Sequence, residues 1–507
     1  SSRAQARRLG SPAWPHQAGQ APGIPAAGAM LRGPGSVAAR GLRELRRSGR
    51  PALCRPLTGP ADFRNRMAYR LGHAPRICQT GAEAVEPYLS SGCMVFLHAG
   101  CATPQLLVDG LVEVAKRRDL RDVRTIHMHL EGTGPLPRDD PEAAKHITPL
   151  APFIGANLRQ QIQKGDAMYI PVHLGELPLL FRRRVIVPDL ALVHVSPPDK
   201  HGYCTLGTSV DWARSAIEHS TAMVGLVNPQ MPRIYGDGVI HFSQFDAVVH
   251  TDAPIFQHGT KALLPEEVEI GKHIAALVPD GATLQMGIGS VPDAALAQMG
   301  GHKHLGVHTE MFSDGILPLV ESGVLDNSYK SMHRGKIVSA FCAGSQKLYD
   351  FLDDNPAVRL LDVSFTNDVN VIQQQHQMVG INSCIEMDFT GQAASGSIGT
   401  RIYSGFGGQV DFLRGAAMCP DGKAILAFTS RTNKGVSRIV PELHAAAGVV
   451  TTRAVVQYVV TEHGVTNLFG LTLPERAREL IRLAHPGDRE ALERKAVERF
   501  GKAFRPL

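Results

Sequence analysis

A glycine-containing loop near the middle of the chain has the residues for binding an anion. The short apolar run at residues 283–286 leads into Gly287, Ile288 and Gly289, and a helical pattern begins near Pro292. Backbone N–H groups at such a strand, loop and helix start have no partners within the helix and point at one spot. That arrangement suits a phosphate or an oxyanion.

A carboxylate, Glu310, follows the loop after a second apolar stretch that contains Leu305 and Val307. We expect Glu310 at the end of a buried strand, near the anion-binding loop. A carboxylate with an ordinary pKa of about 4 is ionised at neutral pH and needs no base to act as a nucleophile. Loop and carboxylate together are the parts of a covalent acyl-transfer centre. A Glu after a strand also serves in many proteins as a helix cap or ion-pair partner, and its position alone leaves this open.

Two other interpretations of this region find less support in the residues. The loop lacks the third glycine of G-x-G-x-x-G, because Pro292 stands there, and no Gly-Lys-Ser/Thr follows, so neither a dinucleotide fingerprint nor a P-loop is present. A purely structural turn stays open. His302, His304 and His308 have a spacing that metal ligands can use, but no further ligand pattern accompanies them. We therefore expect structural or surface histidines and no metal.

Three motifs in this sequence resemble the acetyl-CoA hydrolase/transferase family, and most closely its 4-hydroxybutyrate CoA-transferase type. They begin at Gln285 (QMGIG), at His308 (HTEMFSDG) and at Gly405 (GFGGQVDF). The resemblance extends over residues 68–500. It departs from the family pattern at residues 471–474, where a basic, glycine-containing stretch is more usual.

The resemblance implies a CoA-transferase that works by a ping-pong mechanism through a glutamyl-CoA thioester on Glu310. Backbone N–H groups of residues 405–408 are candidates for an oxyanion site because glycine lets the main chain approach a ligand, and the resemblance favours Gly408. The residues expected to contact coenzyme A are Gln285, Met286, Gly287, Ile288, Gly289, Asn367, Gly407, Gly408 and Lys434. As alternatives, Asn367 is a turn residue and Lys434 a solvated surface lysine.

The family also implies partners and alternatives. Acyl-CoA and a short-chain carboxylate are the expected substrates, with no tightly bound cofactor, and the chain is expected to form a homodimer. The acyl group is not determined by the sequence. An acyl-CoA hydrolase and a catalytically silent acyl-CoA-binding protein on the same fold are the two alternative functions.

The alternation of apolar runs with helical patterns predicts an α/β fold. We expect two related α/β domains, residues 61–260 and 261–507, with mostly parallel sheets covered by helices and the active site in the cleft between them. Residues 251–264, with Pro254 and Gly259, are the expected linker. The expected strands are residues 94–98, 167–173, 185–187, 190–195, 247–250, 283–286, 337–341, 360–364, 424–429 and 454–460. The expected helices are residues 82–86, 106–114, 265–277, 474–483 and 489–500.

The charge of the chain is concentrated in its first sixty residues. The chain of 507 residues has a net charge of +6, but residues 1–60 contain ten arginines, no lysine and one acidic residue, so the remainder is slightly acidic. No basic nucleic-acid surface is therefore expected. The arginine-rich, acid-poor stretch after Met30 has leucines and arginines at amphipathic spacing, which is typical of a mitochondrial presequence. We expect residues 1–60 to be a disordered leader, and the protein to be located in the mitochondrial matrix; a plain basic tail is the alternative.

Cysteine usage is compatible with a reducing compartment. The eight cysteines are scattered and form no C-x-x-C pair, so neither a zinc ribbon nor a disulfide scaffold is expected.

Overall fold

Strands that are apolar along their whole length form the sheet of the first half. The computed structural model describes residues 72–137, 140–259, 262–287 and 289–507, so the expected leader lies outside the described residues. All neighbouring strands of this eight-stranded sheet are parallel. In spatial order they are β1 (Arg76–Cys78), β10 (Ala247–His250), β8 (Ala222–Val227), β6 (Leu190–Val195), β2 (Met94–Leu97), β3 (Val123–Ile126), β4 (Ile147–Ala151) and β5 (Met168–Tyr169).

The central strands β2, β6 and β8 are buried at every residue, as a parallel sheet covered on both faces requires. The helices of this half include α3, whose buried side is Leu107, Val108, Leu111, Val112, Val114 and Ala115. The helices are α2 (Gly81–Val85), α3 (Gln105–Arg117), α4 (Arg159–Lys164), α5 (Leu177–Arg182) and α6 (Ala213–His219). β7 (Tyr203–Thr205), which follows β6, pairs antiparallel with β9 (Val239–His241), which follows β8.

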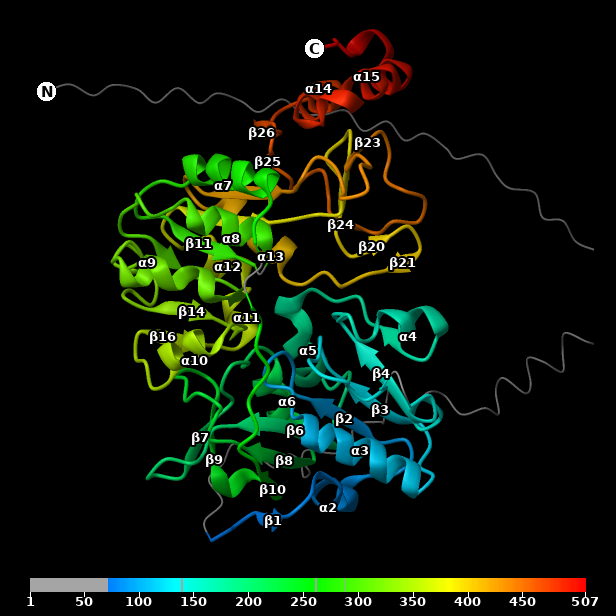
Figure 1. Cartoon of the computed structure of the whole chain (residues 1–507), viewed down its shortest axis with the longest axis vertical. Coiled ribbons are helices and arrows are strands. Elements are labelled where there is room, and N and C mark those ends of the chain that lie inside the picture. The colour runs from blue at the N-terminus through cyan, green and yellow to red at the C-terminus, as the bar shows by residue number, and fades with distance from the viewer. Residues whose placement is uncertain (1–71, 138–139, 260–261, 288) are drawn as a thin grey trace, which may run out of the picture. The chain divides into compact units, whose positions relative to one another are not determined.

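The second half has its own six-stranded sheet, parallel except for its last strand. In spatial order the strands are β12 (Gly306–Val307), β11 (Thr283–Met286), β17 (Met378–Asn382), β22 (Lys423–Ala427), β25 (Tyr458–Thr461) and the antiparallel β26 (Gly464–Asn467). Helices α7 (Pro265–Leu277) and α8 (Ser290–Ala297) run side by side next to β11, as Figure 1 shows in green. This sheet carries the anion-binding loop that the sequence predicts.

Short elements connect these strands. Two parallel pairs are β13 (Met311–Phe312) with β15 (Phe341–Cys342) and β14 (Ile337–Ser339) with β16 (Val358–Leu360). A four-stranded sheet contains β18 (Glu386–Asp388), β19 (Ala393–Ala394), β23 (Ile439–Val440) and β24 (Val449–Thr451), and β20 (Ser397–Ile398) pairs with β21 (Arg401–Ile402). The helices are α9 (Leu317–Glu321), α10 (Gln346–Leu352), α11 (Val363–Thr366), α12 (Val369–Ile372), α13 (Gln409–Met418), α14 (Leu473–Leu483) and α15 (Pro486–Phe500).

The α/β fold class is confirmed, whereas several of the expected strands are wrong wholly or in part. Of the strand expected at residues 167–173, only Met168–Tyr169 is present, as β5. Residues 185–187 form no strand, and the strand expected at residues 360–364 ends at Leu360, before α11. Residues 454–457 precede β25 instead of belonging to it. The physical reason is that short apolar runs are equally compatible with strands, buried loops and short helices.

The apolar core is shared by the two halves. Its main cluster includes residues from Cys78 to Val460, while a second cluster lies under α13, α14 and α15. The boundary expected between residues 260 and 261 falls on two positions outside the described residues, and it stays a prediction. Among the described residues, no helix is long and apolar enough to cross a membrane.

Candidate active site

Glu310 lies between β12 and β13, where its backbone is held by three donors. Its carbonyl oxygen accepts hydrogen bonds from Ala340 N at 3.0 Å, Phe341 N at 3.2 Å and Ser339 Oγ at 2.9 Å. A carbonyl with three partners leaves the main chain of Glu310 little freedom. The side chain is partly exposed and lines a cavity.

The carboxylate of Glu310 contacts two of the residues that the resemblance singles out. Asn367 Nδ2 donates to Glu310 Oε2 at 2.8 Å, and the Gly408 backbone N–H also bonds to this carboxylate. A Cβ atom at position 408 would lie 2.0 Å from Glu310 Oε2 and 2.2 Å from Asn367 Nδ2. Only glycine therefore allows the carboxylate, the amide and the backbone N–H to meet here.

The electrostatic setting of Glu310 differs from the sequence-based expectation. Burial raises the pKa of its carboxyl group to about 7, because removal from water disfavours the charged form. Hydrogen bonds from Asn367 and Gly408 lower this pKa, and the nearby Asp411 raises it. The Glu310 carboxyl group is thus harder to ionise than a solvated glutamate.

Asp411, in the first turn of α13, is a buried carboxyl group beside Glu310. Its Oδ2 atom accepts from Asn367 Nδ2 at 3.3 Å and from Gly175 N at 3.2 Å. Burial raises the pKa of Asp411 to about 6. The Asn367 amide therefore lies between two carboxyl groups, which fixes its orientation with the NH₂ group toward both.

The predicted anion-binding loop follows β11 and faces the same cavity. Gln285, Met286 and Gly287 line that cavity, and Gln285 Oε1 accepts from Asn382 Nδ2 at 2.9 Å. Gly289 has φ +127° and precedes α8, and neither Gly287 nor Gly289 would place a Cβ within 4 Å of another group. The loop backbone thus has open space on its ligand side. Ile288 lies outside the described residues.

The cavity has a volume of about 490 Å³ and is lined by both halves of the chain. From the first half come residues 128–132 and 153–157 with Arg159, Leu174 and His258; from the second come residues 285–287, Glu310, Met311, Phe341, Asn382, Gly408 and Gln409. A cavity of this size can hold part of an acyl-CoA molecule. The expected site in a cleft between the halves corresponds to this cavity.

The glycine-rich loop at residues 405–408 packs between Glu310 and the first half of the chain. Gly405 packs so tightly that a Cβ would lie 2.5 Å from Pro152 O, and Gly407 has φ +56°. The Gly407 carbonyl accepts from Leu174 N at 3.0 Å. Gly408 lines the cavity, whereas Gly407 lies just behind it, with its would-be Cβ 3.8 Å from Glu310 Oε1.

Lys434 lies apart from these groups. It is exposed in the turn that follows Thr432, whose Oγ1 accepts from Lys434 N at 3.3 Å, and it does not line the cavity. A contact of Lys434 with coenzyme A stays a prediction.

The three histidines have separate structural partners. His302 Nε2 lies 3.0 Å from Val278 O, and His304 Nδ1 lies 2.7 Å from Asp326 Oδ2. His308 is buried with Nε2 2.9 Å from Thr366 O. The described part of the chain contains no cluster of three or more His, Cys, Asp or Glu side chains that could bind a metal.

Sequence reasoning missed several polar groups of the cavity wall. Glu131 and His258, which are 127 positions apart, form an ion pair of 2.8 Å, and His129 lies beside them. Asp411 belongs to the GFGGQVDF motif, three residues after Gly408. Its position in the first turn of a helix that starts at the glycine loop is a signal that could have identified it.

Comparison with known proteins shows the family. Residues 65–256 match the acetyl-CoA hydrolase/transferase N-terminal domain and residues 344–496 the C-terminal domain of the same name. The chain is 49% identical over 439 residues to the succinyl-CoA:acetate/propanoyl-CoA:succinate CoA transferase of Fasciola hepatica, covering 86% of this chain and 91% of that protein. It is 42% identical to the 4-hydroxybutyrate coenzyme A transferase of Clostridium kluyveri, covering 83% and 97%.

A solved structure gives the same result. The 4-hydroxybutyrate CoA-transferase of Porphyromonas gingivalis is similar with a TM-score of 0.72 and 38% identity, covering 84% of this chain and 98% of that one. The chain therefore belongs to the acetyl-CoA hydrolase/transferase family, as the three motifs predict.

Proposed function

We propose that this protein is a CoA-transferase that moves CoA from a short-chain acyl-CoA to a carboxylic acid, with Glu310 as the covalent nucleophile. The single observation that carries the proposal is the Glu310 carboxylate, which lines a cavity beside the open loop after β11 and accepts hydrogen bonds from Asn367 and Gly408. The relatives named above are CoA-transferases and support the same class of enzyme.

The reaction proceeds in two halves. In the first, a carboxylate oxygen of Glu310 attacks the thioester carbonyl, giving an acyl-glutamyl anhydride and CoA thiolate. The thiolate then attacks the glutamyl carbonyl, which releases the first carboxylic acid as its anion and leaves a glutamyl-CoA thioester. In the second half, the acceptor carboxylate attacks this thioester, the thiolate leaves, and it returns to the acyl carbon to give the new acyl-CoA and free Glu310.

The donors on Glu310 have a role in both halves. When the glutamyl carbonyl is attacked, negative charge develops on an oxygen of the group that Asn367 Nδ2 and the Gly408 N–H already contact. Donors preorganised in this way typically contribute several kcal/mol to a barrier that passes through an oxyanion. The family resemblance implies a contact of Asn367 with coenzyme A. In addition, Asn367 bonds to the Glu310 carboxylate.

Formation of the thioester can be tested by mass spectrometry. Incubation with acyl-CoA and no acceptor should add CoA less one water to the peptide that contains Glu310, and the Glu310→Gln variant should show no adduct. Glu386→Gln is a matched control, because Glu386 is also buried but pairs with His444 outside the cavity. An adduct that persists in Glu310→Gln, or none in the wild type, would contradict the proposal.

An acyl-CoA hydrolase is distinguished by the fate of the acyl group. A transferase should form acetyl-CoA from butyryl-CoA and acetate, with little free thiol. Thiol release at the same rate with and without acetate would instead indicate hydrolysis. Binding of acyl-CoA without adduct or turnover for any acid would indicate a catalytically silent binding protein.

The acyl specificity requires a direct survey. Relatives are named for succinyl, acetyl, propanoyl and 4-hydroxybutyryl groups, so these acids and butyrate form the test panel. The ratio of kcat/KM values between acceptors identifies the physiological pair.

Location and assembly are further parts of the proposal. We place the protein in the mitochondrial matrix on the composition of residues 30–60, and a fusion of that segment to a fluorescent protein should co-localise with mitochondria. Replacement of Arg43, Arg46 and Arg47 by Glu should abolish import, and a diffuse wild-type fusion would refute the location. We also propose a homodimer, for which light scattering should give about twice the mass of one chain.

A further inference from the structure

Asp211 is a buried aspartate of the first half whose side chain is used entirely to hold its own loop. It lies between β7 and α6, has φ +31°, and is 0% exposed. Its Oδ1 atom accepts from Ala213 N at 2.8 Å, and its Oδ2 atom accepts from Ser209 Oγ at 2.5 Å. Asp tolerates a positive φ better than most residues, and the two bonds fix the loop in that conformation. Asp211 does not line the cavity.

The backbone of Asp211 is directed toward the second half of the chain. Its N–H donates to Ala340 O at 3.0 Å. The Ala340 N–H in turn donates to Glu310 O at 3.0 Å. One residue, Ala340, therefore links the backbone of Asp211 to the backbone of Glu310.

A second connection leads from Asp211 to the carboxylate of Glu310. The Asp211 carbonyl accepts from Val363 N at 2.9 Å, at the first residue of α11. Asn367 ends this short helix, with its N–H on Val363 O at 2.9 Å. Asn367 Nδ2 then donates to Glu310 Oε2 at 2.8 Å. Since α11 is a single turn, the position of Val363 determines that of the Asn367 amide.

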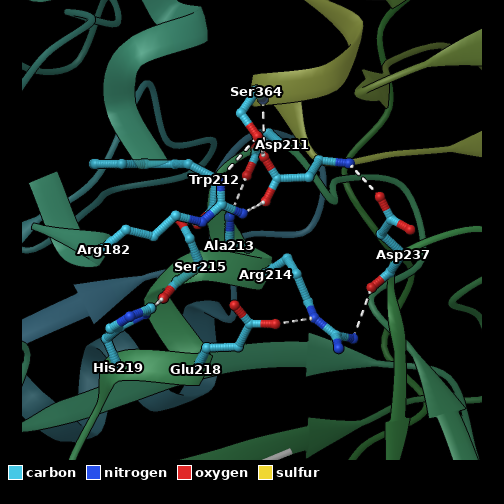
Figure 2. A network of polar contacts seen from close by, with 11 residues as sticks. Arg182, Asp211, Trp212, Ala213, Arg214, Ser215, Glu218, His219, Asp237 and Ser364 are labelled. Carbon is cyan, nitrogen blue, oxygen red and sulfur yellow. Dashed lines mark hydrogen bonds and ion pairs between the residues drawn. The ribbon is translucent and has the colours of Figure 1, made fainter. Parts of the chain in front are cut away.

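Ion pairs and hydrogen bonds support this arrangement from outside. Arg182 on α5 pairs with Asp362 at 2.5 Å and donates to Ser364 Oγ at 2.8 Å. Arg214 on α6 donates to Asp237 O at 2.9 Å, and Asp237 Oδ2 accepts from Asp362 N at 2.9 Å. Figure 2 shows Asp211 and Ser364 close together between Arg182 and Asp237. Cationic side chains of the first half thus hold the start of α11.

We propose that Asp211 is a positioning residue for Glu310, acting across the two halves on both the backbone and the carboxylate of the nucleophile. The inference rests on the proposed role of Glu310 as nucleophile. A group displaced by about 1 Å from the reacting atom can slow a reaction by on the order of 10²-fold. A loop that fixes both ends of the nucleophile is therefore expected to act on the chemical step more than on substrate binding.

Three substitutions, two at Asp211 and one at its partner Ser209, distinguish a positioning role from an effect on protein stability alone. Asp211→Ala removes the acceptor of Ala213 N and leaves a residue that disfavours the positive φ. Asp211→Asn retains the Oδ1 acceptor and tolerates that φ. Ser209→Ala removes only the hydroxyl on Oδ2 and serves as a milder variant should Asp211→Ala fail to fold.

Asp388 provides a matched control. It is also a buried aspartate, 3% exposed, with Oδ1 accepting the N–H two residues on, Thr390 N at 2.9 Å, and a hydroxyl, Thr390 Oγ1 at 2.7 Å. It is the last residue of β18, before the turn to β19, and does not line the cavity. Asp388→Ala should therefore lower the Tm without changing the kcat of the folded protein.

The measurements are kcat and KM for acyl-CoA, and the rate of the glutamyl-CoA adduct without acceptor. We expect Asp211→Ala to lower kcat and adduct formation by about tenfold or more, with KM within about twofold, and Ser209→Ala to do so by a few-fold. Asp211→Asn should restore most of the rate. Unchanged kcat in folded Asp211→Ala and Ser209→Ala, or an equal loss in Asp388→Ala, would overturn the inference. A wild-type protein that forms no adduct would refute the proposed function instead.

Discussion

The two halves of this chain share a strand–loop–helix pattern, but they differ in what packs inside the loop. In the first half β2 is followed by a loop with Gly100 and then by α3; in the second β11 is followed by Gly287, Gly289 and then α8. The first loop is closed on itself, because Thr103 Oγ1 donates to Gly100 O at 2.7 Å and accepts from Glu131 N at 3.0 Å. All of its residues from 100 to 104 are buried.

The second loop has no comparable packing around its glycines. Neither Gly287 nor Gly289 has another group within 4 Å of where a Cβ would lie, and Gly289 is exposed. The strand, loop and helix pattern therefore predicts a turn in both cases, but only the second loop has open space around its glycines. Glu310 lies next to the open loop, in the strand region beyond β12, and the closed loop lies behind the cavity wall.

The largest expected effect comes from removing the nucleophile beside the open loop. Glu310→Gln keeps the size of the side chain and its hydrogen-bond acceptor but cannot form the anhydride. We expect the transfer rate to fall by on the order of 10³-fold or more, as for other covalent nucleophiles, with acyl-CoA binding retained. Steady-state transfer and calorimetric binding measure the two quantities, and residual transfer above a few per cent would point to another nucleophile.

The next effect is expected at Gly408, where the second half brings its glycine loop onto Glu310. In Gly408→Ala the new Cβ would lie 2.0 Å from Glu310 Oε2, so the carboxylate or the loop must move. We expect kcat to fall by on the order of 10²-fold. Gly470→Ala is a control on an exposed turn with positive φ and open space around its Cβ, and it should keep the wild-type kcat.

The comparison of the two loops is tested directly by a pair of alanine substitutions. Gly287→Ala meets open space in the free protein, so its Tm should be unchanged while KM for acyl-CoA rises by about tenfold, equivalent to about 1.4 kcal/mol. Gly100→Ala, at φ +57°, should lower stability by about 1–2 kcal/mol and leave KM unchanged. If both variants changed only the Tm, the second loop would be a structural turn like the first.

The smallest effects concern pH and follow from the pKa of Glu310. Because burial raises this pKa to about 7, the nucleophile is about one-tenth ionised at pH 6, and kcat/KM should rise about tenfold between pH 6 and the plateau. An acid limb centred near pH 4 would show that the carboxyl group is fully solvated.

The same pKa also predicts a change in stability with pH. The ordinary pKa is 4.5 and the folded one about 7, so between these values the folded state binds a proton that the unfolded state has lost. The stability that Glu310 gains from binding this proton is thus fully present below pH 4.5, and it is lost as the pH rises toward 7. The Tm of Glu310→Gln should fall less than that of the wild type between pH 5 and pH 8, and a parallel fall would contradict the assignment.

How far the sequence predicts the site depends on how far apart the partners are along the chain. Glu310, Gly408 and Gln285 can be predicted from the sequence because each belongs to a short motif that resembles the family. The contact of Asn367 with Glu310, 57 positions away, was not foreseen, since it depends on how α11 packs. Asp411 belongs to the GFGGQVDF motif, but the motif alone does not show that its carboxyl group lies beside Glu310.

Asp211 and the Glu131–His258 pair could not be predicted from local patterns. Each is a common residue type in an ordinary loop, and its partners come from elements more than a hundred positions away. Long-range pairing of this kind leaves no periodicity in the sequence. The strands expected at residues 185–187 and 360–364 are wrong for a different reason. An apolar run indicates burial but does not determine the backbone conformation.

The sequence by itself determined the α/β class and the family, and it singled out Glu310 as the proposed nucleophile, because apolar alternation, glycine spacing and motif order are local properties. Only the tertiary structure decided that one glycine loop is open and the other closed, that burial raises the pKa of Glu310, and that the backbone of Asp211 bonds to Ala340 and Val363. These properties depend on distances between side chains and on exclusion of water, and both arise only when the two sheets pack around a shared core.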